Sequence, residues 1–138
     1  MKNLAKSLLA IVFCIGIFNV LFAKTSENQV SFEKKLTNTR WIYCNETEGR
    51  KKCITLEFVS ESQCVFIIEE QLEGKEQFHQ PSPRCDYKYQ YPNITFTNGL
   101  FFDSDKKFYR PKRGYYFEEG IRMELEDGNI LEFAPLTK

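Results

Sequence analysis

The chain has 138 residues, with 19 basic and 19 acidic side chains, so its formal net charge is zero. A chain without net charge has no overall field that attracts it to nucleic acid or to an anionic membrane. Its aromatic residues are mainly Phe and Tyr, a composition that favours strands over helices.

Residues 1–23 have the pattern of a cleavable signal peptide. Lys2 and Lys6 precede an apolar run at 8–22, and the small residue Ala23 follows it. The run is shorter than the ~20 residues that a helical span needs. We therefore expect an exported protein, periplasmic or secreted, with no stable membrane span after cleavage. The remaining chain of about 115 residues has 17 basic and 19 acidic side chains and suffices for one domain.

Residues 24–37 are polar and form the predicted N-terminal arm. Phe32 and Leu36 lie four residues apart, a spacing that permits one short helical turn. A single domain is then expected from residue 38 to residue 138.

From residue 39 onward, apolar and polar side chains alternate in short segments, which is the signature of a sheet. The alternation is clearest at 41–44, 54–58, 64–68, 85–91 and 121–126. We predict an all-β fold, an antiparallel up-and-down meander that closes into a small barrel of about eight to ten strands. Closure removes the exposed edges of such a sheet.

Turn residues punctuate these strands. Asn98-Gly99 separates 94–97 from 100–102 and predicts a hairpin between them, because Asn and Gly accept positive φ. The segment 71–84 contains Pro81 and Pro83 and is interpreted as a mobile surface loop.

The last hairpin turns at residues 127–128, an Asp-Gly pair. A register with Leu125 opposite Leu131 and Met123 opposite Phe133 keeps one face apolar. We expect that register, with a left-handed residue at position 128 or 129.

Four cysteines follow the signal sequence, and their parity suggests how they pair. Cys44 and Cys53 both fall on outward positions of neighbouring strands, so we predict a Cys44–Cys53 disulfide. Cys64 and Cys85 both fall on inward positions, where a second bridge is expected and two buried thiols are the alternative. A Cys53–Cys85 pairing also stays open.

The region from residue 38 to residue 133 resembles small, secreted, lipocalin-like β-barrels of bacteria. Thr39-Arg40-Trp41 opens the first strand, where lipocalins carry Gly-x-Trp. The other segments that carry the resemblance are 53–59, 63–69, 87–89, 94–99 and the closing hairpin of 123–125 with 131–133. The resemblance implies a calycin-like barrel in which Trp41 has a structural role near the closed end.

Inward aromatic side chains define the candidate ligand site. Tyr43, Phe66, Tyr87 and Tyr89 would give a lumen apolar walls with hydroxyl groups. The first functional hypothesis is therefore a binding module for an unknown small apolar or amphipathic ligand.

The second hypothesis is a protein-interaction or inhibitor module with a filled interior. It is motivated by the 71–84 loop and by outward Ile42, Val65 and Ile67. A packed interior beside an exposed apolar patch would favour this partner-binding function.

An enzyme is not expected. The single histidine, His79, lies in the predicted loop. The pair Glu69-Glu70 would point to opposite faces of a strand and is interpreted as solvated charge near a turn. The spacing of Cys and His does not fit zinc, so no metal and no cofactor are expected. The basic run at 106–113 is interpreted as a charged hairpin tip and not as a nucleic-acid site.

Overall fold

The computed structural model describes residues 35–137. The predicted signal peptide at 1–23 and nearly all of the predicted arm, including Phe32, lie outside the described residues. No helix in the described range is long and apolar enough to cross a membrane.

The described chain contains strands and connecting turns and no helix. Its strands are β1 (Arg40–Thr47), β2 (Arg50–Phe58), β3 (Gln63–Leu72), β4 (Phe78–Pro81), β5 (Cys85–Gln90), β6 (Asn93–Thr97), β7 (Phe101–Phe102), β8 (Phe108–Tyr109), β9 (Pro111–Phe117), β10 (Gly120–Leu125) and β11 (Ile130–Pro135).

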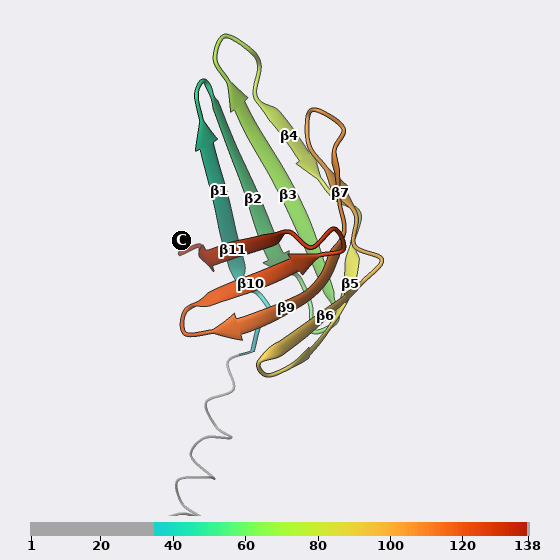
Figure 1. Cartoon of the computed structure of the whole chain (residues 1–138). Coiled ribbons are helices and arrows are strands. Elements are labelled where there is room, and N and C mark those ends of the chain that lie inside the picture. The colour runs from blue at the N-terminus through green and yellow to red at the C-terminus, as the bar shows by residue number, and fades with distance from the viewer. Residues whose placement is uncertain (1–34, 138) are drawn as a thin grey trace, which may run out of the picture. The chain divides into compact units, whose positions relative to one another are not determined.

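Eight of these strands close into an antiparallel barrel, which confirms the predicted fold. The barrel follows the chain through β1, β2, β3, β5, β6, β9, β10 and β11, and β11 pairs back to β1. Strand β4 adds to the free half of β3, and β7 and β8 form a separate two-stranded hairpin. Strands β1–β3 run side by side, and β9–β11 cross in front of them (Figure 1).

The predicted loop at 71–84 is wrong in part, because residues 71–72 and 78–81 lie in strands. Strand β3 continues to Leu72, and β4 folds back on it with Ile67 opposite Pro81 and Glu70 opposite Phe78. Phe78 is half-buried and packs against the core. This contact, which the local sequence does not reveal, explains why the Pro-containing segment becomes an edge strand.

The predicted hairpin at Asn98-Gly99 is also corrected. Asn98 has a φ of 60°, in the left-handed region, as expected for a turn. However, β6 pairs with β5 and β9, whereas β7 pairs with β8. A Cβ on Gly99 would lie 2.5 Å from Pro111 Cγ and 2.8 Å from Cys85 Sγ. The turn therefore leads the chain between packed side chains and into the barrel.

The last hairpin keeps its predicted apolar face in a different register. Met123 lies opposite Leu131 and Ile121 opposite Phe133, two residues away from the expected pairing. Gly128 has a φ of 87°, in the left-handed region. A shift of two residues preserves side-chain parity, so the inward and outward faces are unchanged.

Candidate functional site

A column of stacked aromatic rings occupies the middle of the barrel. Phe101 of β7 stacks on Phe66 of β3, with ring centroids 4.6 Å apart and planes at 22°. Tyr109 of β8 stacks on Phe101 in turn, with ring centroids 5.1 Å apart and planes at 7°. We name residues 101–109 the plug hairpin, because its Phe101 and Tyr109 rings are buried in the core.

The barrel centre is closely packed around this column. A void large enough for water would leave some exposed area on the side chains that line it. Ten core residues, drawn from five strands of the barrel, have no exposed area. They are Ile54, Leu56, Phe58, Cys64, Phe66, Ile68, Cys85, Ile94, Ile121 and Met123.

The four predicted ligand-binding residues lie in the core or pack against it. Phe66 is fully buried beneath Phe101, and the Tyr87 hydroxyl donates a hydrogen bond to the Ser60 carbonyl at 2.6 Å. Tyr43 and Tyr89 are half-buried and pack against the core. Phe66 and Tyr87 are thus core residues, with Tyr43 and Tyr89 at its margin.

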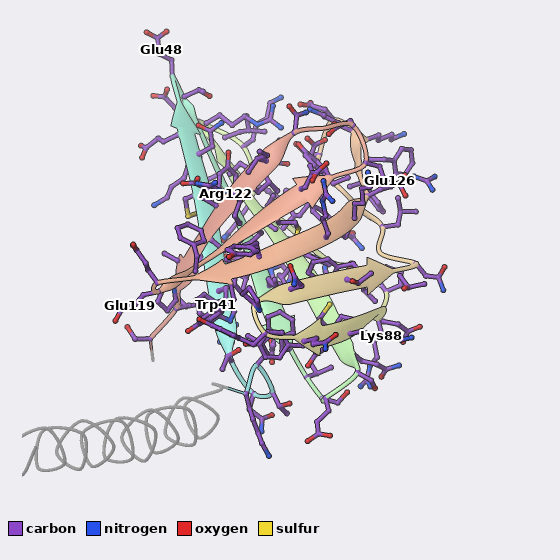
Figure 2. All side chains as sticks on the ribbon, turned by 60° about the horizontal axis from the view of Figure 1, so that its bottom comes forward. Trp41, Glu48, Lys88, Glu119, Arg122 and Glu126 are labelled. Atoms are coloured by element: carbon purple, nitrogen blue, oxygen red, sulfur yellow. A yellow bond between two sulfur atoms is a disulfide. The ribbon has the colours of Figure 1, made fainter. Side chains whose placement is uncertain are left out.

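Trp41 lies at the end of the barrel where β1 begins (Figure 2). Its ring meets Tyr116 edge-on at 5.6 Å, and its Nε1 donates to Thr39 Oγ1 at 2.9 Å. Leu36, at the start of the described chain, is buried in the same core. The tryptophan ring therefore packs in the core, and its indole N–H is hydrogen-bonded.

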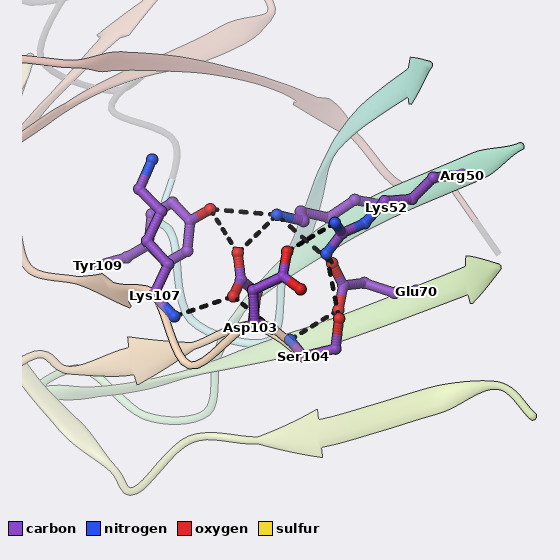
Figure 3. Close-up of polar contacts among 8 residues, drawn as sticks. Arg50, Lys52, Glu70, Asp103, Ser104, Lys107 and Tyr109 are labelled. Carbon is purple, nitrogen blue, oxygen red and sulfur yellow. Dashed lines mark hydrogen bonds and ion pairs between the residues drawn. The ribbon is translucent and has the colours of Figure 1, made fainter. Parts of the chain in front are cut away.

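At the opposite end of strands β2 and β3, a charge network holds the plug hairpin in place (Figure 3). Lys52 Nζ lies 2.7 Å from Asp103 Oδ2 and 3.2 Å from the Tyr109 hydroxyl, which itself donates to Asp103 at 3.0 Å. Arg50 donates to Glu70 at 2.5 Å and to Asp105 at 2.7 Å. Two strands of the barrel thereby bind the loop between β7 and β8.

The two buried carboxylates of the network are stabilised in their charged forms. Burial alone would raise the pKa of Glu70, but hydrogen bonds from Ser104 and Arg50 outweigh it, and the pKa is lowered. Burial likewise acts to raise the pKa of Asp103, and the bonds from Lys52, the Lys107 amide and Tyr109 lower it. An unpaired carboxylate at either position would be costly, so the pairing fixes the loop.

The sequence interpretation missed this network. We expected Glu69-Glu70 to be solvated, whereas Glu70 is 1% exposed. A signal was present, since Ile54 and Ile68 face inward and strand parity carries Lys52 and Glu70 to the same side. Asp103 carried no comparable signal, because its place depends on where the plug hairpin enters the barrel.

The cysteines differ in their bonding. Cys44 and Cys53 lie opposite each other on β1 and β2 and form a disulfide, as predicted. Cys64 and Cys85 also face each other in register, but both are free, buried thiols, so the expected second bridge is absent. The hydrogen bond to Cys85 and burial both raise the pKa of Cys64, which keeps its thiol protonated.

His79 lies on β4 with its Nδ1 3.1 Å from Glu69 Oε1, and both side chains are largely exposed. Within residues 35–137, no three or more His, Cys, Asp or Glu side chains are grouped so that they could hold a metal ion.

The outer face of β1–β4 carries an apolar row. Ile42, Thr55 and Ile67 lie opposite one another on adjacent strands, and Ala134 of β11 and Pro81 of β4 extend the row at its two ends. We call these five residues the outer apolar row. Thr55 is only 7% exposed although it points outward, which shows how closely its neighbours cover it.

Polar pairs border the row along the strands. Arg40 lies 3.6 Å from Glu57 on one side, and Glu69 pairs with His79 on the other. An apolar centre with a polar border is the usual arrangement of a protein interface.

No family model, curated protein or solved structure matches the chain.

The charge network should make stability depend on pH in a defined direction. The lowered pKa of Glu70 and Asp103 contributes stability that is present above the ordinary carboxyl pKa of about 4 and is lost as pH falls through the folded-state values. Glu70→Gln should cost about 3 kcal/mol at pH 7 and flatten the acid side of the profile. Urea unfolding at several pH values between about 2 and 7 measures both effects, because carboxyl groups titrate within this range.

The matched control is Glu69→Gln, which changes the adjacent, largely exposed carboxylate. It should shift the free energy of unfolding by no more than about 0.5 kcal/mol. Equal effects of the two substitutions would contradict a structural role for the buried carboxylate.

The bonding of the cysteines predicts a thiol count. Residues 24–138, folded in air and then unfolded with an alkylating agent but no reductant, should gain two adducts, at Cys64 and Cys85. After reduction, Cys44 and Cys53 should react as well. Intact-mass and peptide mass spectrometry give the count, and adducts on all four cysteines before reduction would refute the disulfide.

Proposed function

We propose that the chain is an exported binding module that recognises a protein partner through the outer apolar row. The observation that carries the proposal is the alignment of Ile42, Thr55 and Ile67 across three adjacent strands of the barrel. Polar pairs border the row, and the disulfide between Cys44 and Cys53 links β1 and β2 on the same outer face.

The expected partner surface is apolar at its centre. The border contains the Arg40–Glu57 ion pair on one side and the contact between Glu69 and His79 on the other. Burial of the row against a complementary apolar surface would supply the main driving force, about 25 cal/mol for each Å² removed from water. The paired charges at the border would set the orientation of the partner rather than the affinity.

The alternative function, binding of a small apolar or amphipathic ligand inside the barrel, has less support. Phe101 and Tyr109 occupy the space next to Phe66 in which such a ligand would lie. A ligand would have to displace the plug hairpin and separate Lys52 from Asp103.

Export and likeness to calycins belong to the proposal. The pattern of residues 1–23 and the Cys44–Cys53 disulfide support export, because disulfides persist in oxidising compartments. The closed eight-stranded meander supports a calycin-like origin. Binding is proposed in preference to catalysis, since His79 is exposed and pairs with a single carboxylate.

Site-directed photocrosslinking in the protein's own host tests the proposal. The change is Ile67→p-benzoylphenylalanine, with Ile130→p-benzoylphenylalanine as the control on β11. The crosslinked protein is then identified, purified and titrated against the unmodified chain. We expect Ile67→Ser to weaken that complex by about tenfold or more, and Ile130→Ser to leave it unchanged.

Thermal melting of both serine variants must first show that they fold. Crosslinks of equal yield at positions 67 and 130, or a complex that Ile67→Ser does not weaken, would refute the outer apolar row as the interface. A small molecule that co-purifies in equimolar amount and fills the barrel would favour the alternative function.

A further inference from the structure

A second surface, on β6 and β9–β11, contains a shallow pocket of about 240 Å³. It lies on the outside of the barrel, where Arg122 projects from β10 (Figure 2). Its lining residues are Asn93, Arg113, Gly114, Tyr115, Arg122, Glu124 and Ile130.

Strand register places the lining side chains in two parallel rows. Asn93, Tyr115 and Arg122 lie opposite one another on β6, β9 and β10. In the next row, Arg113 lies opposite Glu124, which lies opposite Ile130 of β11. The pocket is therefore built on paired strands of the barrel and not on a loop.

Tyr115 supplies an exposed aromatic surface at the pocket. Its side chain is 48% exposed, and its ring stacks with Phe117 at 6.5 Å and 29°. The Arg122 guanidinium lies 5.0 Å from the centroid of the Phe117 ring. Ile130, itself 56% exposed, is the other large apolar side chain that lines the pocket.

The polar groups around the ring are held by ion pairs. Arg113 Nε lies 2.5 Å from Glu124 Oε2, and Arg122 donates from Nε and Nη2 to Glu132 Oε1 at 3.2 and 3.0 Å. A guanidinium has five N–H donors and a carboxylate accepts several bonds, so each pair retains capacity to bind a ligand. The two pairs together carry no net charge.

We propose that this pocket binds a neutral saccharide unit. The apolar C–H face of a sugar ring packs on Tyr115 and Ile130, and its hydroxyl groups bond to Arg113, Arg122 and Glu124. The balanced charge does not select an anion, and the mixed lining does not suit a wholly apolar ligand. The volume is below the ~300–1,000 Å³ typical of sites for drug-sized ligands, which matches one ring of a larger saccharide.

The site is distinct from the outer apolar row, so its test is independent of the proposed protein partner. An array of neutral oligosaccharides of glucose, galactose, mannose and N-acetylglucosamine, with sulfated and sialylated counterparts, is probed with the fluorescently labelled chain. Saturation-transfer NMR then measures the neutral compounds that bind. Tyr115→Ala should weaken this binding by about tenfold, whereas Tyr115→Phe should retain it.

The matched control is Phe108→Ala, which removes another exposed aromatic ring, on β8 and outside the pocket. It should leave saccharide binding unchanged. The proposal is overturned if no neutral saccharide binds, if only sulfated or sialylated compounds bind, or if Tyr115→Ala binds as well as the unmodified chain.

Discussion

The stack of Phe66, Phe101 and Tyr109 is the interaction on which the rest of the structure depends. An eight-stranded barrel encloses a space that side chains must fill or that a ligand can occupy. Here the chain fills it with its own hairpin, and the Lys52 and Lys107 ammonium groups lie 5.7 and 5.2 Å from the centroid of the last ring. The plug hairpin is thereby held in the barrel both by ring packing and by contacts with charged groups.

The packed interior, the buried charges and the outer apolar row all depend on the same strands. Glu70 and Asp103 can remain ionised in the interior because Arg50 and Lys52 extend from β2 to meet them. Strands β2 and β3, which carry Lys52 and Glu70 on their inner face, carry Thr55 and Ile67 of the outer apolar row on their outer face. A filled barrel supports the strands that carry the row, and a surface that is ordered before binding loses less entropy on binding. The proposed interface therefore benefits from packing that it does not itself contact.

Strand parity explains most of what the sequence could predict. It placed Cys44 opposite Cys53, and it applies equally to Glu70, although we assigned that residue to solvent. The failures occur where distant contacts outweigh local signals. Asn98-Gly99 makes a turn, but packing of Phe101 in the barrel directs the strand that follows. The β4 strand forms because β3 is longer than the alternation suggested, and Phe78 meets the core.

The most direct test of a barrel filled by its own hairpin is a calorimetric and NMR titration with benzene. Phe101→Ala should create an apolar cavity beside Phe66, and such cavities bind small aromatic molecules. The unmodified chain should bind no benzene, while the variant should bind about one equivalent, with chemical-shift changes at its core methyl groups. Equimolar binding of benzene inside the unmodified barrel would contradict a packed interior.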